Sequence, residues 1–278
     1  ADSMQVYKKI KILTARPNKE EQKNIKHHLY GVIDLNKNFS TGQWLKLTIN
    51  LINNIRKRKK VPILVGGTGL YFQSLIDGLV KIPEIPLNFR NKIRSKQKKE
   101  GQKKFYKNLL KLDPKVSNKI DSNDIQRSIR AFEVKSFTKI SMYDWLQKTE
   151  PEFEDKEFLR IYIDYKREDL IKKISLRTKK MIKNGAINEV KSFLKLKIKK
   201  DKSINKVIGI DELTQYLSKK IDLQESEELI SIKTRQYAKR QATWARSRMA
   251  SWKKINPSMI ETYLKNLKKT SLKLDQLT

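Results

Sequence analysis

A glycine turn between a predicted strand and a predicted helix could bind a phosphate. Residues 61–65 are apolar and mostly β-branched, as is typical of a buried parallel strand, and residues 70–76 have helical spacing. Between them lies Gly66-Gly67-Thr68-Gly69. A helix that begins after such a turn directs unpaired backbone N–H groups and its positive dipole end into the turn, and Thr68 adds a hydroxyl. The arrangement favours a phosphate or diphosphate, although a glycine pair alone is more typical of an ordinary turn.

Arg177 is a second candidate for anion binding. Leu170, Ile174, Arg177 and Met181 are spaced by four, three and four residues, which places them on one face of a helix. Three of them are apolar, so the spacing predicts a buried arginine, and a buried guanidinium requires an anionic partner. An internal salt bridge and a bound diphosphate both meet this requirement. Alternatively, an arginine at the edge of the stripe can extend its polar end into solvent.

The charge of the chain predicts a polyanionic partner. Its 63 Lys and Arg residues against 30 Asp and Glu give a net charge of +33. Scattered lysines such as Lys57 and Lys59 can result from a general bias toward lysine in the sequence and need not bind a ligand. Arginine is the scarcer cation, yet it clusters at Arg127 and Arg130 and again within residues 235–248. Planar bidentate donors suit phosphates and base edges, so these clusters favour nucleic acid.

The elements that must position these residues indicate an α/β core with a helical insertion. Residues 43–60 have helical spacing, and residues 83–151 contain few strand signals. Asn123 and Gln126 form a capping-box pattern for a helix that begins near residue 125. Residues 158–164 predict a strand, Glu168 and Asp169 open a helix, and residues 225–252 predict a long one.

Composition excludes several classes of protein. The chain lacks cysteine, so disulfides and thiolate metal sites are excluded, and no apolar run approaches the ~20 residues of a membrane span. No signal peptide is visible in the sequence as given. We expect a cytoplasmic protein that contacts no membrane. The adjacent His27 and His28 lack further ligand residues nearby, which argues against a metal site.

Four motifs in fixed order resemble the tRNA dimethylallyltransferase family, which prenylates N6 of the adenosine next to the anticodon. They are Asp2-Ser3-Met4-Gln5, Gly66-Gly67-Thr68-Gly69, Asn123-Asp124-Ile125-Gln126-Arg127-Ser128-Ile129-Arg130 and Lys239-Arg240-Gln241-Ala242-Thr243-Trp244-Ala245-Arg246. The resemblance covers nearly the whole chain. It implies transfer of a dimethylallyl group from dimethylallyl diphosphate to position 37 of tRNAs that read U-starting codons. Mg²⁺ as a cofactor and a monomeric state are also expected.

The resemblance also implies roles for individual residues. Asp2 is then the general base, while Gly66, Gly67, Thr68 and Arg177 hold the diphosphate. The residues implied to contact the tRNA anticodon stem-loop are Asp2, Ser3, Met4, Gln5, Thr68, Arg90, Gln126, Arg127, Ser128, Ile129, Arg130, Lys239, Arg240, Gln241, Thr243, Trp244 and Arg246. Trp244 could equally be a core anchor. His27 matches a family histidine with a packing or substrate-side position.

The chain departs from the family pattern at three places. The P-loop that precedes the Asp-Ser pair in the family is absent from the sequence as given. Lys11 and Leu13 replace an acidic residue and a glycine, and Ile210-Asp211 replaces an aromatic-basic pair.

The fold that the resemblance implies is therefore a P-loop-type parallel sheet without its first strand. Residues 1–85 and 151–278 would form the catalytic core, and residues 86–150 would form a helical insertion that contacts tRNA.

These departures leave two other functions open. A tRNA-binding remnant would keep the RNA surface without efficient catalysis. A small-molecule kinase or a free-nucleotide prenyltransferase would use the phosphate turn alone. The basic final helix and the Gln126–Arg130 motif argue against a free nucleotide, which needs no extended footprint.

Overall fold

The computed structural model describes residues 1–23 and 25–275, which divide into two compact units. The first unit comprises Ala1–Gln73 and Lys156–Thr278, and the second comprises Ser74–Asp155. Among the described residues, no helix is both long enough and apolar enough to cross a membrane. Each unit is described separately below.

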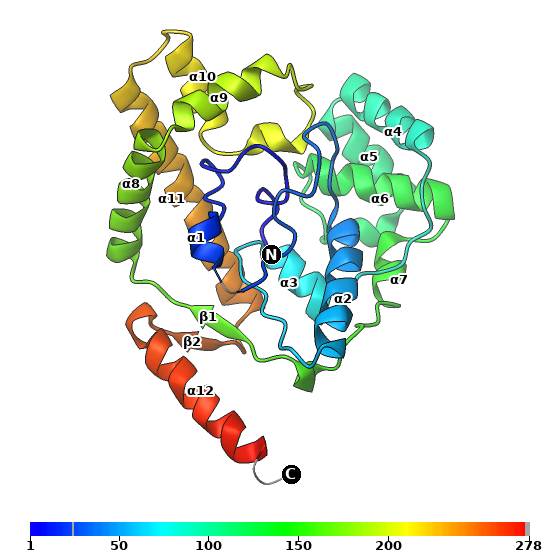
Figure 1. The fold of residues 1–278 in the computed structure, drawn as a ribbon. Coiled ribbons are helices and arrows are strands. Elements are labelled where there is room, and N and C mark those ends of the chain that lie inside the picture. Colours follow the sequence, from blue (N-terminus) through cyan, green and yellow to red (C-terminus); the bar gives the residue numbers. More distant parts are fainter. Residues whose placement is uncertain (24, 276–278) are drawn as a thin grey trace. The chain divides into compact units, whose positions relative to one another are not determined.

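The first unit is largely helical (Figure 1). Its helices are α1 (Lys19–Gln22), α2 (Thr41–Lys57), α3 (Gly69–Ile76, which ends in the second unit), α8 (Arg167–Lys183), α9 (Ala186–Lys195), α10 (Ile210–Leu217), α11 (Leu223–Arg248) and α12 (Ile260–Asp275). Its strands are β1 (Ile161–Ile163) and β2 (Lys253–Ile255), and its short 3-10 helices are η2 (Asp155–Glu157, which begins in the second unit), η3 (Ser203–Lys206) and η4 (Pro257–Met259).

The two strands form a small parallel sheet. Ile161, Tyr162 and Ile163 pair with Lys253, Lys254 and Ile255. The predicted strand at 158–164 is thus confirmed over its second half. The coarse class, α/β with a parallel sheet, holds.

The prediction of a buried strand at residues 61–65 is wrong. The described structure assigns no strand there, and Val61, Ile63 and Val65 are 82%, 80% and 69% exposed. Pro62 and Leu64, which alternate with them, are half-buried. The sequence carries strand propensity, but a strand also needs a neighbouring backbone to complete its hydrogen-bond ladder. No described residue supplies that ladder.

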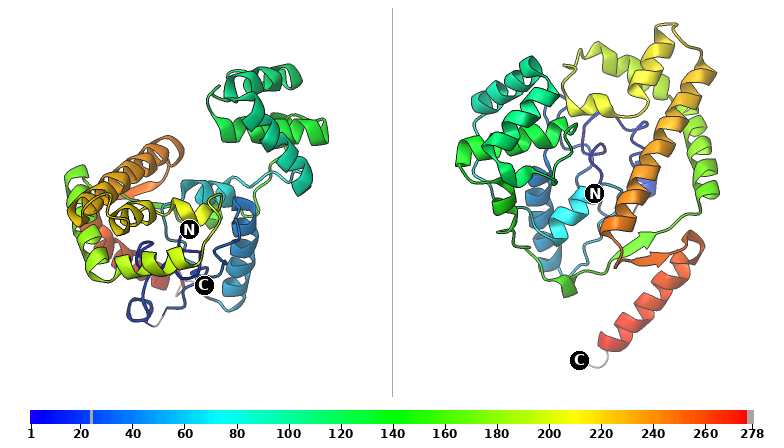
Figure 2. Two further views of the ribbon diagram at one scale, coloured as in Figure 1. Left: turned by 90° about the horizontal axis from the view of Figure 1, so that it is seen from above. Right: turned by 180° about the vertical axis from the view of Figure 1, so that it is seen from behind.

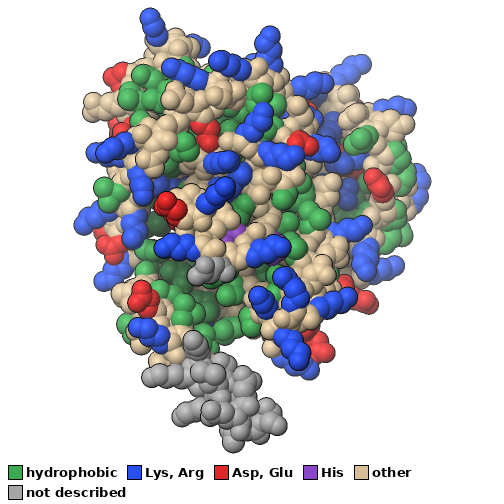
Figure 3. Space-filling model, viewed as in Figure 1, with side chains coloured by type: hydrophobic (Ala, Val, Ile, Leu, Met, Phe, Trp, Pro, Cys, Tyr) green, Lys and Arg blue, Asp and Glu red, His purple; other side chains and the backbone are tan. Residues whose placement is uncertain are grey.

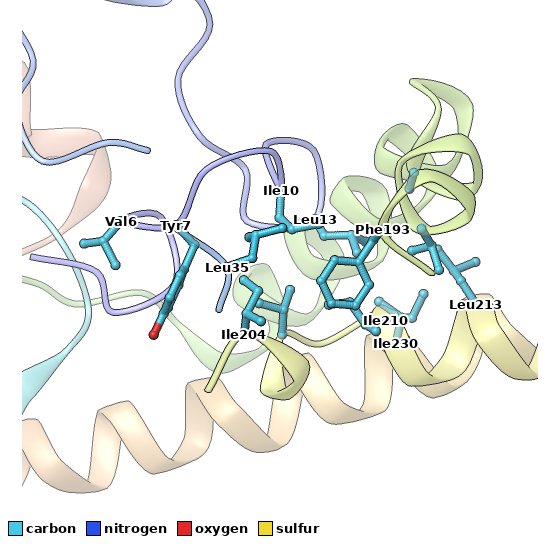
Figure 4. Packing of buried hydrophobic residues seen from close by; sticks show 13 residues of the cluster. Val6, Tyr7, Ile10, Leu13, Leu35, Phe193, Ile204, Ile210, Leu213 and Ile230 are labelled. Carbon is cyan, nitrogen blue, oxygen red and sulfur yellow. The ribbon is translucent and has the colours of Figure 1, made fainter. Parts of the chain in front are cut away.

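The N-terminal segment packs into the main core of this unit. Val6, Tyr7, Ile10, Leu13 and Leu35 are buried against side chains of η3, α9, α10 and α11 (Figure 4). The N–H of Lys8 donates a hydrogen bond to the carbonyl of Ile33, and the N–H of Ile33 donates one to the carbonyl of Val6. These bonds hold the segment in place. Asp2 therefore stands at the start of a firmly packed stretch.

The long helix α11 packs against two other helices of this unit. Asp222 caps its start by accepting the N–H of Glu225 at 2.8 Å. The helix packs against α8 and α10, and the right-hand view of Figure 2 shows α8 and α11 side by side. α8 begins with Glu168 and Asp169 in its first turn, as predicted.

The second unit is a group of helices with its own core (Figure 2). It contains α4 (Leu87–Glu100), α5 (Gln102–Leu112), α6 (Ile125–Thr138), α7 (Met142–Leu146) and η1 (Pro114–Val116). Phe105, Leu109, Val116 and Ala131 are fully buried in it. The cap of α6 is Asp124, which accepts the N–H of Arg127 at 2.9 Å, and not Asn123 as the capping-box pattern predicts.

Candidate active site

Hydrogen bonds join the glycine turn to the first three residues. The amino group of Ala1 donates to the carbonyl of Val65 at 2.7 Å, and the N–H of Thr68 donates to the carbonyl of Ala1 at 3.2 Å. The N–H of Ser3 donates to the Thr68 hydroxyl at 3.1 Å. Asp2 and Thr68, which are 66 positions apart in the sequence, thus belong to one network.

The turn needs glycine because other groups approach it closely. A Cβ on Gly66 would overlap the backbone of Ala1, and one on Gly67 would overlap the Gln241 amide. A Cβ on Gly69 would overlap the Trp244 indole. Gln241 also donates its side-chain N–H to the carbonyl of Gly67 at 2.9 Å. Helix α11 therefore holds the turn directly, a contact that the sequence patterns did not predict.

Asp2 is oriented by the backbone that follows it. Its Oδ1 accepts the N–H groups of Met4 and Gln5 at 2.7 and 3.1 Å. Within the described residues, Oδ2 has no hydrogen-bond partner. One carboxylate oxygen is thus fixed, and the other can accept a proton from a ligand.

Three tyrosines surround this carboxylate. Burial raises the pKa of Tyr30, Tyr71 and Tyr237, and the negative charge of Asp2 raises each of them further. The phenols therefore stay protonated at neutral pH and can act as hydrogen-bond donors. Hydrogen bonding with the Thr68 and Gln241 side chains partly offsets these effects by lowering the pKa of Tyr237. Sequence reasoning missed Tyr237, although it lies four residues before Gln241 on the same helical face.

Arg177 shares the electrostatic environment of Asp2, but it is not buried as predicted. Its side chain is exposed, while Ile174 and Thr178 on the same helix are buried. Surrounding protein atoms lower the pKa of its guanidinium, and the charge of Asp2 raises it. No ion pair of Arg177 occurs within residues 1–23 and 25–275. Arginine at the edge of an apolar stripe extends its polar end outward, which explains the difference.

The predicted RNA face of α11 is exposed. Lys239, Arg240, Thr243 and Arg246 are accessible, and Arg246 donates to the Thr243 hydroxyl at 3.2 Å. Trp244 is half-buried against Gly69, and its buried indole N–H has no hydrogen-bond partner. This packing supports the anchor interpretation of Trp244. Lys and Arg side chains are spread over the whole face in Figure 3, so charge alone does not define the RNA site.

The segment with atypical residues is held through its backbone. Glu189 accepts the N–H groups of Lys11, Ile12 and Leu13 at 2.6, 2.9 and 3.0 Å. Gln5 donates to the carbonyls of Thr14 and Ala15 at 2.9 and 3.0 Å. Because backbone groups make these contacts, the departures at positions 11 and 13 leave them intact.

In the second unit, the predicted tRNA motif divides between surface and core. Gln126 and Arg127 are exposed, and Arg90 and Arg130 are half-buried. Ser128 and Ile129 are buried, so their side chains face the core of this unit, and a contact of these two residues with RNA stays a prediction. α6 packs one face against α5, and residues 128 and 129 lie on that face. The motif therefore has one side toward solvent and one side toward the core of this unit.

His27 contacts residues close to it in the sequence. Its Nδ1 lies 2.8 Å from the carbonyl oxygen of Ile25, and its ring packs 5.8 Å from that of Tyr30. Within the described part of the chain, no group of three or more His, Cys, Asp or Glu side chains could hold a metal ion.

Sequence comparisons point to one family. The model of the IPP transferase family matches residues 5–248. Over its full length the chain is 74% identical to the tRNA dimethylallyltransferase of Pelagibacter ubique (strain HTCC1062), of which it covers 89%. It is 38% identical over 271 residues to the tRNA dimethylallyltransferase of Rickettsia massiliae (strain Mtu5), a match that covers 96% of this chain and 74% of that relative.

Solved structures agree with the sequence comparisons. A tRNA isopentenylpyrophosphate transferase of Staphylococcus epidermidis matches with a TM-score of 0.65 at 30% identity, over 97% of this chain and 89% of that one. A eukaryotic dimethylallyltransferase acting on tRNA matches with a TM-score of 0.78 at 28% identity, over 88% and 62% of the two chains. The chain belongs to the IPP transferase family.

Proposed function

We propose that this chain transfers the dimethylallyl group of dimethylallyl diphosphate to N6 of adenosine 37 in tRNAs that read U-starting codons. The 74% identity to a tRNA dimethylallyltransferase carries the proposal. The network that joins Asp2, Thr68 and Tyr237 supports it, because it combines a proton acceptor with hydroxyl donors beside one glycine turn. The IPP transferase match over residues 5–248 includes Thr68 and Tyr237.

Asp2 serves as the general base in this proposal. As N6 of the adenine attacks the first carbon of the dimethylallyl group, a new C–N bond forms and the bond from carbon to diphosphate oxygen breaks. The exocyclic amine is a weak nucleophile until it can lose a proton. Asp2 Oδ2 accepts that proton, while the Met4 and Gln5 N–H groups keep the carboxylate in place.

Arg177, Thr68 and Tyr237 receive the departing diphosphate. The charge on the leaving group grows in the transition state, and donors fixed in advance stabilise it. The Thr68 N–H is already bonded to the Ala1 carbonyl, so it is not among these donors. In the described residues, the N–H groups of Gly69 and Leu70 at the start of α3 have no partner and point into the turn.

Magnesium is expected with a diphosphate substrate, but the described residues do not form a site for it. No cluster of three or more suitable side chains exists among them, and Asp2 is the carboxylate beside the turn. Mg²⁺ in phosphate-transfer sites takes most ligands from the phosphates and water. No step of the proposed reaction therefore depends on a metal ion held by protein side chains.

Two surfaces would hold the tRNA. One is the exposed face of α11 with Lys239, Arg240, Thr243 and Arg246. The other is the surface of α4 and α6 with Arg90, Gln126, Arg127 and Arg130, in the unit proposed as the tRNA-contacting insertion. Aromatic and basic side chains together suit a single-stranded loop, and the Arg240 guanidinium lies 5.6 Å from the Tyr237 ring. We further propose that the chain acts as a monomer in the cytoplasm.

Incorporation of labelled dimethylallyl diphosphate into an anticodon stem-loop tests the function. The expected result is label in a stem-loop with adenosine at position 37 and none in one with inosine there, which lacks the exocyclic amine. Binding of both stem-loops is measured in parallel and should be similar. Tight binding without incorporation would identify the chain as an RNA-binding protein and contradict the proposal.

A further inference from the structure

A buried carboxylate holds three arginines together in the second unit. Glu133 on α6 is 1% exposed. Its Oε2 lies 3.3 Å from Nε of Arg90 and 3.7 Å from a terminal nitrogen of Arg130, and its Oε1 lies 3.5 Å from Nε of Arg94. Two of the arginines come from α4 and one from α6. The sequence motifs single out Arg90 and Arg130, but not Arg94.

The arrangement contains more positive charge than the carboxylate can neutralise. Three guanidinium groups against one carboxylate leave two positive charges. The arginine side chains remain 34%, 47% and 41% exposed, so they reach solvent while Glu133 does not. Burial lowers the pKa of Arg130, and the charge of Glu133 raises it. The two surplus positive charges are therefore available to an external anion.

Most of the arginine donors remain free for an external ligand. Each guanidinium carries five N–H donors. Glu133 accepts a hydrogen bond from the Arg90 Nε at 3.3 Å, and hydrogen bonding to Glu133 also raises the pKa of Arg130. The Arg94 and Arg130 contacts are longer ion pairs, and Glu133 Oε1 has no hydrogen-bond partner. Arg90 and Arg94 contact the carboxylate through Nε, and both side chains are partly exposed to solvent.

We propose that Arg90, Arg94 and Arg130 form one phosphate-binding trio on the RNA surface, and that Glu133 is its positioning residue. This inference rests on the proposed tRNA substrate. The buried carboxylate brings three planar cations closer than their mutual repulsion would otherwise allow. Planar donors in a fixed arrangement suit the oxygens of an RNA phosphate better than mobile lysines do. Glu133 itself touches no RNA.

Arg94→Gln tests the trio at an exposed position. The matched control is Lys92→Gln, which removes the same charge from an exposed residue about 200° away around α4. Binding of a labelled anticodon stem-loop is measured for the full chain at several salt concentrations. We expect Arg94→Gln to weaken binding about tenfold more than Lys92→Gln and to lower the log–log salt slope by about 0.7–0.9. Equal effects of the two changes would refute the trio.

Glu133→Gln distinguishes positioning from simple charge. Removing a negative charge near the RNA should tighten binding if only net charge mattered. Positioning predicts weaker binding despite the added positive charge. A melting curve of the same variant, recorded with and without tRNA, identifies loss of folding. Should the variant unfold, Arg94→Lys replaces it: positioning of planar donors predicts weaker binding, and a pure charge effect predicts no change.

The outcomes also separate this inference from the proposed function. If the unaltered chain transfers the prenyl group and binds tRNA, but the Arg94 and Glu133 variants behave like the Lys92 control, the inference alone is wrong. If the unaltered chain fails to bind the stem-loop, the proposed function fails, and the trio has no RNA to hold.

Discussion

Thr68→Val should reduce catalysis while leaving the fold of the chain intact. Valine has nearly the same shape as threonine but lacks the hydroxyl that accepts the Ser3 N–H at 3.1 Å and bonds Tyr237. The change leaves two polar groups without partners. Each lost hydrogen bond of this kind is worth about 0.5–1.5 kcal/mol, so the local cost is about 1–3 kcal/mol. Thr68→Ser keeps the hydroxyl and is the matched control.

The lost free energy should raise the activation barrier of the reaction, because these hydrogen bonds join the glycine turn to the segment that carries Asp2. About 1.4 kcal/mol corresponds to a factor of ten, so kcat/KM should fall about 5–150-fold in Thr68→Val and much less in Thr68→Ser. Tyr237→Phe removes the partner hydroxyl, and the double variant should lose less than the sum of the single ones. Steady-state kinetics with a stem-loop substrate compare the unaltered chain with all four variants. Additive losses, or equal losses in the Ser and Val variants, would refute the network.

Three further predictions concern neighbouring residues. Arg177→Ala should abolish binding of dimethylallyl diphosphate, measured by titration. Because the side chain is exposed, tRNA binding and the melting temperature should stay unchanged. Joint loss of stability and of binding to both ligands would indicate a structural role. Gly69→Ala should destabilise the protein by about 1–3 kcal/mol, because the new Cβ would overlap the rigid Trp244 ring. Combining it with Trp244→Ala should relieve the overlap. Equal melting temperatures for Gly69→Ala and the unaltered chain would contradict this prediction. Burial raises the pKa of Tyr71 above the ordinary tyrosine pKa near 10, so the neutral phenol favours the folded state. The stability of the protein should therefore fall as the pH rises above about 10. The melting temperature of Tyr71→Phe should fall less steeply than that of the unaltered chain over the same pH range.

Local patterns predicted the elements whose signals are complete within one segment. The helix after the glycine turn, the start of α8 and most of α11 follow from spacing, capping and charge. Strand β1 was predicted for the same reason. Its partner β2 was not, because Lys253–Ile255 is short and two of its three residues are lysines. Pairing with a strand 92 positions away decides its conformation, and no local pattern reports that.

The site shows the same division between local and distant information. The sequence resemblance identified Asp2 and Thr68, and the structure joins them through Ala1 and Ser3. Tyr237 could not be recognised from a local pattern, since its contact with Thr68 depends on how α11 lies against the turn. The motif containing Ser128 was assigned as a whole, although a helix that packs on one side must bury part of any continuous motif.

The single-turnover rate of Asp2→Asn tests the central claim most directly. The chain is saturated with an anticodon stem-loop and with dimethylallyl diphosphate, and the N6-dimethylallyl adenosine formed is measured by mass spectrometry. Asparagine keeps the size of the side chain and can still accept the Met4 N–H, but it cannot take the N6 proton. The account predicts product from the unaltered chain and a rate about 10²–10⁴ times lower for Asp2→Asn, with both ligands still bound. Equal single-turnover rates for the two proteins would contradict the account.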